Sequence, residues 1–203
     1  MPLSPRQWHS LSADDYRDIL RACDRAANLL QQSDTLIIDT ETTDLNGEII
    51  QIAMINTQGQ VVLDTLVHPQ TPVTPGAYAV HHIGNSRLRT APDWSRIAPQ
   101  FASLAVNRLL VSYNAPFDET MVHNSYSAVL LVPIPLRWEC AMRLYSRYVH
   151  EPSPYGGCRW VPLPGGDHSA LGDTRATLEV LQLMAADCDR LKRIVQQLQT
   201  SKV

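Results

Sequence analysis

The chain has 203 residues, a length that predicts one domain with some chain left over, at about 150 residues per domain. Apolar types make up 44% of it and charged types 18%, which is enough for a sizeable core and too apolar for a disordered chain. The 17 basic and 20 acidic side chains give a formal net charge of −3, which argues against a polybasic protein that binds nucleic acid by bulk phosphate neutralisation. Any contact with nucleic acid is therefore expected to be local and helped by a bound cation.

The sequence gives no sign of a membrane or secreted protein. No apolar run reaches about 18 residues, and residues 1–6 lack the apolar core of a secretory signal. An even number of cysteines allows disulfides, but at this chain length and without a signal peptide we expect reduced thiols at Cys23, Cys140, Cys158 and Cys188. The cysteines form no CxxC pair, so the spacing of zinc ligands is absent as well. We expect a cytoplasmic protein.

Residues 1–33 are predicted to form an N-terminal helical extension. Ser12 and Asp15 have the spacing of a capping box, with Asp in place of the usual Glu. Apolar residues then recur at helical spacing up to a helix end near Gln32.

The rest of the chain alternates between strand and helix patterns. Residues 35–40 form a short apolar run that is typical of a buried central strand. Further strands are predicted at 49–56, 60–67, 109–113 and 134–138, with Gly59 in a hairpin turn. Helices are predicted at 94–106, 116–129 and 169–199, and loops rich in Pro and Gly at 69–76 and 152–166. This order favours an α/β fold, a mixed β-sheet flanked by helices, over residues 34–190, with a C-terminal helix end or tail at 191–203.

Asp39-Thr40-Glu41 ends the first predicted strand. Because side chains alternate along a strand, the two carboxylates point to one face, roughly 6–7 Å apart. Like charges held so close raise the pKa of one group unless a cation lies between them. Taken alone, a solvated strand end is an equally good interpretation.

Two further motifs also have ordinary structural explanations when taken singly. Pro116 fits a first helical turn, where Asp118 complements the helix dipole and Asn114 is a plain cap. His168 lies beside the second Pro/Gly loop, and Asp173 follows about one turn into the last helix. A loop histidine of this kind can carry a proton near neutral pH.

The combination predicts a metal-dependent site. The carboxylates come from three distant segments, at element edges that one sheet can bring together: Asp39, Glu41, Asp118 and Asp173. Such a cluster is unfavourable without divalent cations. Two metal ions about 3.5–4 Å apart can activate water and stabilise the leaving oxygen of a phosphodiester. With His168 as a base, the sequence predicts phosphoryl transfer to water.

On these ordered motifs the sequence resembles the DEDDh family of 3′–5′ exonucleases, relatives of the proofreading subunit of bacterial replicative polymerase with an RNase H-like fold. The matching stretches are Asp39-Thr40-Glu41-Thr42-Thr43, Asn114-Ala115-Pro116-Phe117-Asp118 and His168-Ser169-Ala170-Leu171-Gly172-Asp173. The similarity covers about residues 34–186, and weaker agreement at 80–92 and 138–142 resembles the exonuclease X-like branch. The resemblance therefore implies an exonuclease domain over 34–190.

The resemblance also implies a role for each residue. Asp39, Glu41 and Asp173 would hold the metal that carries the nucleophilic water. Asp39 would bridge to a second metal, which Asp118 supports through water. His168 would deprotonate the nucleophile. The implied cofactor is Mg²⁺, two ions per site, with Mn²⁺ able to substitute. The implied substrate-binding residues are Thr42, Thr43, Leu45, His82, Asn114 and Phe117.

The sequence departs from the family pattern at three places. Asp44 stands where glycine usually follows the two threonines, and Tyr113 replaces a common histidine. A Pro/Gly loop between Arg147 and His168 replaces the usual helix, which bears on how the strand is held upstream of the cut.

The sequence gives weaker evidence for a functional role of several other residues. Tyr155 and Trp160 are candidates for stacking on bases, although Trp160 fits a core edge equally well. Structural or surface roles are expected for His81, His123 and His150, and a core role for Leu171, Leu178 and Leu181. Candidate phosphate contacts, which more often form an ordinary solvated surface, are Arg87, Arg89, Arg96, Arg137, Arg143, Arg147 and Arg159.

We therefore expect a 3′–5′ exonuclease that releases nucleoside 5′-monophosphates from single-stranded or frayed DNA ends. Two alternatives stay open: an exoribonuclease that trims RNA, because nothing reads the 2′-hydroxyl reliably, and a non-catalytic binding module of the same fold. A zinc hydrolase is disfavoured by the oxygen-rich ligand set. The expected partner is a nucleic acid 3′ end; a protein partner or a homodimer is left open.

Overall fold

Five strands form one mixed sheet in the order β3-β2-β1-β4-β5. The computed structural model describes residues 11–200, so the parts of the predicted extension at 1–10 and of the predicted tail at 201–203 lie outside the described residues. The strands are β1 (Thr35–Thr42), β2 (Ile49–Asn56), β3 (Val61–Leu66), β4 (Leu109–Ser112) and β5 (Arg137–Cys140). β1 pairs antiparallel with β2 and parallel with β4, so it is the middle strand.

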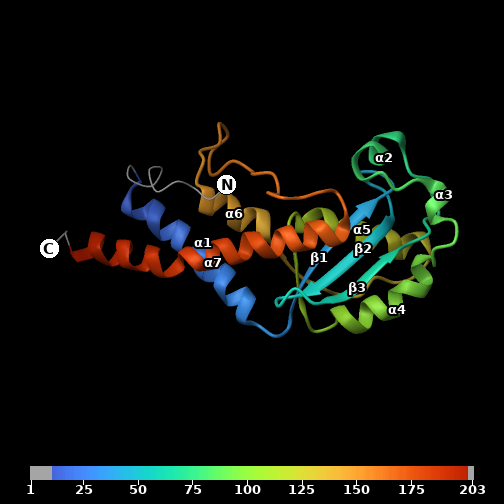
Figure 1. The fold of residues 1–203 in the computed structure, drawn as a ribbon, viewed down its shortest axis with the longest axis horizontal. Coiled ribbons are helices and arrows are strands. Elements are labelled where there is room, and N and C mark those ends of the chain that lie inside the picture. Colours follow the sequence, from blue (N-terminus) through green and yellow to red (C-terminus); the bar gives the residue numbers. More distant parts are fainter. Residues whose placement is uncertain (1–10, 201–203) are drawn as a thin grey trace.

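Helices cover both faces of the sheet (Figure 1). One face packs against α1 (Ala13–Gln31), α6 (Ala141–Val149) and α7 (Ala170–Thr200), and the other against α4 (Trp94–Ala105) and α5 (Ala115–Ala128). The short helices α2 (Pro75–His81) and α3 (Asn85–Leu88) lie between β3 and α4 in the chain. Figure 1 shows α7 running along the sheet and continuing with α1 beyond it.

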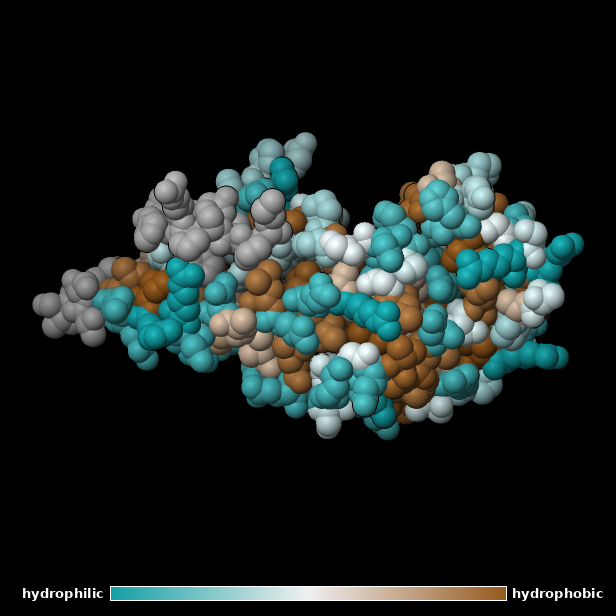
Figure 2. Space-filling view, viewed as in Figure 1, coloured by the Kyte–Doolittle hydropathy of each residue, from teal (hydrophilic) through white to brown (hydrophobic). Residues whose placement is uncertain are grey.

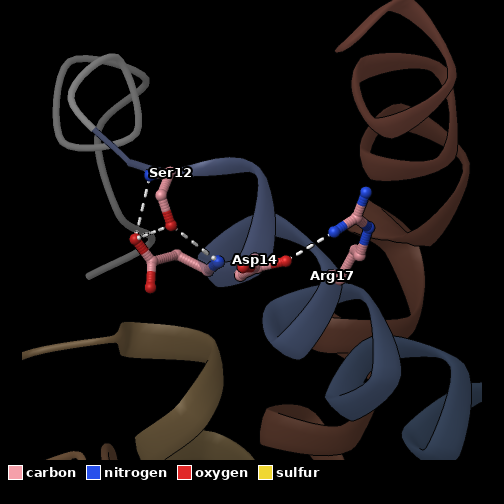
Figure 3. Close-up of polar contacts among 4 residues, drawn as sticks. Ser12, Asp14 and Arg17 are labelled. Atoms are coloured by element: carbon pink, nitrogen blue, oxygen red, sulfur yellow. Dashed lines mark hydrogen bonds and ion pairs between the residues drawn. The ribbon is translucent and has the colours of Figure 1, made fainter. Parts of the chain in front are cut away.

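The start of α1 is fixed by its own first turn. Ser12 Oγ accepts a hydrogen bond from Asp15 N (3.2 Å), and Asp15 Oδ2 accepts one from Ser12 N (2.9 Å), which completes the predicted capping box. Arg17 donates to Asp14 in the same turn (Figure 3).

The predicted fold class is confirmed: a mixed sheet flanked by helices with an N-terminal helix. Predicted helices 94–106, 116–129 and 169–199 and strands 49–56, 60–67 and 109–113 match within one residue at each end. The predicted core stripe of the last helix is also confirmed, with Leu178 and Leu181 buried and Leu171 packed against them.

Three boundaries were wrong. β1 continues to Thr42, beyond the predicted end at residue 40, because the antiparallel pairing with β2 goes on through Glu41. β5 starts at Arg137 rather than 134; Pro133 and Pro135 have no amide hydrogen for a ladder. α2 begins inside the predicted loop 69–76, where Thr74 Oγ1 accepts from Ala77 N and Pro75 fits the first turn.

Three helices, α2, α3 and α6, were not predicted. α6 follows β5 without a connecting loop and its N-cap Cys140 makes no side-chain cap, so it lacks a start signal in the sequence. The division into an extension, a domain over 34–190 and a tail stays a prediction. Over residues 11–200, no helix is both long and apolar enough to cross a membrane.

Candidate active site

β1 presents different side chains to the two helical layers. Ile37 belongs to the core under α7, whereas Ile38 belongs to the core under α5. By alternation, Asp39 and Glu41 lie on the α7 face and Thr40 on the α5 face. The middle strand therefore brings two carboxylates beneath the start of α7.

Three of the predicted carboxylates come together there. Oxygen atoms of Asp39, Glu41 and Asp173 all lie within 4.8 Å of one another. Asp173 is in the first turn of α7, so the cluster joins two segments far apart in the sequence. Carboxylate oxygens at this spacing are the ligands that Mg²⁺ and Mn²⁺ prefer, and the donor set fits such an ion.

The electrostatics of the cluster favour protons or cations. Burial, followed by the charges of Asp173 and Asp118, raises the pKa of Glu41 to about 8. Burial, followed by Asp118, Asp173 and Glu41, raises the pKa of Asp39 well above its usual value. A divalent cation removes both causes, because it neutralises the repulsion and replaces the lost hydration.

Asp118 approaches β1 from the other face. Its Oδ1 accepts a hydrogen bond from Thr40 Oγ1 (2.8 Å), and its Oδ2 accepts one from Ser112 Oγ. Burial raises the pKa of Asp118 to about 6, while these two hydroxyls lower it. Asp118 is thus outside the three-carboxylate group, yet its charge still acts on Asp39 and Glu41.

The start of α7 is built around Asp167, which the sequence analysis did not single out. Asp167 Oδ1 accepts from Ser169 N (3.0 Å) and Ser169 Oγ (2.7 Å), and Asp167 N donates to Asp173 Oδ1 (2.9 Å). A Cβ at Gly172 would lie 2.1 Å from Asp167 Oδ1, so any larger residue there would displace the Asp167 carboxylate. On the other side, Gln51 Oε1 of β2 accepts from Ala170 N (3.3 Å). These contacts set α7 against the end of β1.

His168 lies between this cap and the Pro/Gly loop. It has φ of +59°, a left-handed backbone that is uncommon outside glycine, and its side chain is exposed. Such strain is often found at functional sites. Burial is the main cause that lowers the pKa of His81, and the charges of His82 and then His168 lower it further, while the hydrogen bond to Thr42 O raises it.

The turn after β1 fixes Thr43 by two hydrogen bonds to the backbone of Glu48. Thr43 N donates to Glu48 O (2.8 Å), and Thr43 Oγ1 accepts from Glu48 N (3.0 Å). Glycine is needed at Gly47, where a Cβ would lie 2.1 Å from Thr43 Oγ1. Asp44 is outside the left-handed region, so aspartate in place of the usual glycine does not strain this turn.

Two hollows open on either side of a ridge formed by Leu45 and Phe117. The first, about 400 Å³, has Glu41 in its wall and is closed by α2. Its lining residues are Thr40, Glu41, Thr42, Asp44, Leu45, Gly76, Ala77, Val80, His81 and Phe117. The second, about 370 Å³, is lined by residues that include Leu45, Phe117, Asn114, Arg143 and Trp160. Figure 2 shows the surface dipping between α2 and the segment before α7.

Most of the predicted substrate-binding residues line these hollows, and two do not. Thr42, Leu45 and Phe117 line the first and Asn114 the second. Thr43 and His82 line neither of these two hollows; His82 is the exposed C-cap of α2. His81, predicted to be structural, lines the first hollow, where its Nε2 contacts Thr42 O (3.1 Å) and its Nδ1 accepts from Ile83 N.

Several sequence candidates are engaged elsewhere. Arg137 pairs with Asp34 (3.0 Å) and Arg159 with Glu151 (3.3 Å). Tyr113, in place of the family's histidine, donates from its hydroxyl to Val161 O (2.6 Å) and so fastens the loop before α7. All four cysteines are free thiols.

The comparisons with known proteins agree with this geometry. Residues 36–181 match the model of the RNase_T family, described as Exonuclease. The chain is 33% identical over 173 residues to the uncharacterized exonuclease CP81 of Escherichia phage 186, covering 76% of this chain and 89% of that protein. The chain belongs to the DEDDh exonuclease family. The family is one of divalent-metal-dependent nucleases, as the sequence predicted.

Other family relatives match over shorter or more diverged stretches. Exodeoxyribonuclease 10 of Escherichia coli K12 is 32% identical over 114 residues, 55% of this chain and 46% of its own length. Exonuclease X, solved in complex with 5′ overhanging duplex DNA, superposes with a TM-score of 0.52 at 26% identity, covering 79% of this chain and 99% of that one. The nuclease domain of 3′hExo, a DEDDh family member bound to rAMP, has a TM-score of 0.55 at 14% identity over 78% of this chain and 95% of that chain, which shows the fold alone.

Proposed function

We propose that this exonuclease removes nucleotides from the 3′ end of single-stranded or frayed DNA as nucleoside 5′-monophosphates. The observation that carries the proposal is the meeting of Asp39, Glu41 and Asp173 within 4.8 Å beside a hollow of nucleotide size. DNA is favoured over RNA by the likeness to exodeoxyribonuclease 10.

The hollow closed by α2 is proposed to hold the terminal nucleotide. Leu45 and Phe117 offer apolar surface to the base, and the backbone around Thr42 lies beside the sugar. Glu41 is in the same wall, so a nucleotide seated there has its 5′ phosphate at the carboxylate cluster. Leu45 stands exposed beyond the rim, where it blocks a base pair from entering.

The carboxylates have separate proposed tasks. Asp39, Glu41 and Asp173 would bind one Mg²⁺, and Asp39 would share a second with Asp118 acting through water. Bound ions supply the charge that lowers the pKa of a water and stabilises the leaving oxygen. Thr40 and Ser112 orient Asp118, since both hydroxyls donate to its carboxylate.

His168 is the proposed general base. It lies at the start of α7, ahead of Asp173, with its ring exposed to the solvent that supplies the nucleophile. It accepts the proton of the attacking water, and the α7 cap at Asp167 holds the histidine in its left-handed conformation.

The test compares 5′-labelled single-stranded DNA, duplex DNA and RNA oligomers incubated with Mg²⁺. We expect a ladder that shortens from the 3′ end, fastest on single-stranded DNA, and none in EDTA. Asp39→Ala and Asp173→Ala should abolish it while the variants stay folded. Asp64→Ala, an exposed aspartate of β3, is the matched control. A faster ladder on RNA would overturn the DNA assignment, and an Asp173→Ala variant as active as the parent would overturn the metal assignment.

A further inference from the structure

The second hollow adjoins the proposed active site. Leu45 and Phe117 line both hollows, so the two lie next to each other, and a strand that leaves the proposed terminal nucleotide site can pass into the second one. Its volume of about 370 Å³ is close to the 400 Å³ of the first. Each hollow thus has room for one nucleotide.

Trp160 lines the second hollow, and its side chain lies outside the hydrophobic core. Its residue is 68% exposed, which excludes the core-edge role that the sequence left open. The backbone on both sides is fixed, because Arg159 N donates to Glu151 O (2.8 Å) and Val161 O accepts from Tyr113 (2.6 Å). A large aromatic ring that is exposed to solvent on a fixed backbone can serve as a platform on which a base stacks.

Arg143 adds a positive charge to the same hollow. It lies in the first turn of α6, is exposed, and has no ion-pair partner among residues 11–200. By contrast, Arg137 and Arg159 are already paired with carboxylates. Arg143 is therefore the lining cation available to a phosphate.

We propose that the second hollow binds the nucleotide that precedes the terminal one, with its base stacked on Trp160 and its phosphate paired with Arg143. The inference rests on the proposed 3′-exonuclease function and deepens it. Trp160 belongs to the Pro/Gly loop that this chain has between α6 and α7, so the loop supplies the grip upstream of the cut. The recognised chemistry is an unpaired base and its phosphate, in DNA or RNA.

The test uses two substrates that fill different sites. The p-nitrophenyl ester of thymidine 5′-monophosphate occupies only the terminal site, whereas oligo(dT) occupies both. We expect Trp160→Ala to raise KM for oligo(dT) roughly 10- to 100-fold, the range of one lost base stack, with kcat nearly unchanged. Hydrolysis of the ester should stay at the parent rate, and Trp160→Phe should restore most of the affinity for the oligomer.

Matched controls come from the same loop and helix. Tyr155→Ala removes an aromatic ring that is 98% exposed and lines neither hollow, so oligo(dT) should be degraded as by the parent.

Arg143→Gln should weaken oligo(dT) binding and flatten its salt dependence by about 0.7 in the logarithmic slope, the value of one single-strand phosphate, whereas Arg147→Gln should not.

Each outcome decides a separate point. Trp160→Ala with parent KM on oligo(dT), or with equal losses on oligomer and ester, would overturn the stacking role. A parent enzyme that hydrolyses neither substrate would overturn the proposed nuclease function on which this inference rests.

Discussion

Glu41 couples the stability of the metal-free protein to pH. Its pKa of about 8 in the folded state lies above the value of about 4.3 for an unfolded glutamate. Because the folded value is the higher one, ionising Glu41 costs more free energy in the folded state than in the unfolded state. This destabilisation is absent below about pH 4 and grows as the pH rises toward 8. The cause is burial first and the neighbouring carboxylates second.

We therefore expect metal-free Glu41→Gln to be more stable than the parent at pH 8, by on the order of 2–4 kcal/mol, and equal to it below about pH 4. Thermal unfolding in EDTA at several pH values measures this difference. Glu179→Gln, at an exposed position of α7, should follow the parent throughout. Adding Mg²⁺ should reverse the order at pH 8, and a variant that gains as much from Mg²⁺ as the parent would contradict a metal role for Glu41.

Replacing His168 tests the proposed proton transfer in the chemical step. As the proposed base, it should cost on the order of 10²–10⁴ in single-turnover rate on 5′-labelled single-stranded DNA when replaced by alanine. Its exposed ring makes a loss of folding from the substitution unexpected. His123→Ala, at an exposed position of α5, should keep the parent rate. A His168→Ala enzyme as fast as the parent would remove this histidine from the mechanism.

At the level of elements, the first turn of α7 holds the site together through a close fit. A methyl group at Gly172 would meet Asp167 Oδ1, whose residue also donates its amide to Asp173. Gly172→Ala should therefore displace the cap and lower activity more than it lowers thermal stability. In a double-mutant cycle, the loss caused by Gly172→Ala should shrink when Asp167→Gly is already present. Equal losses in both backgrounds would show that the close approach does not matter.

The sequence predicted elements well where their own pattern decides them. The apolar run of β1 and the capping box of α1 are local signals, and both elements are present. The end of β1 at Thr42 could not be predicted, because polar residues there are kept extended by pairing with β2. α6 was missed because it is short and has no capping side chain.

For the whole molecule, alternation along β1 and the position of Asp173 near a helix start were enough to predict that Asp39, Glu41 and Asp173 meet. The contacts of Asp118 were not predictable, since Ser112 and Thr40 reach it only when α5 packs on the sheet. The exposed Trp160 likewise depends on how Tyr113 fastens a loop nearly fifty residues away in sequence. Long-range packing determines these details, and no local pattern records it.

The packing of α1 predicts how the molecule unfolds. Ile19 of α1 is fully buried in the same core cluster as Leu181 of α7, the helix that carries Asp173. Ile19→Ala should lower the free energy of unfolding by about 2–5 kcal/mol, whereas Leu20→Ala, half-buried, should cost less. In urea, helical signal and nuclease activity should be lost in one transition in both the parent and Ile19→Ala. Activity that persists after a first transition would show instead that α1 is an appendage, whose packing does not support the site.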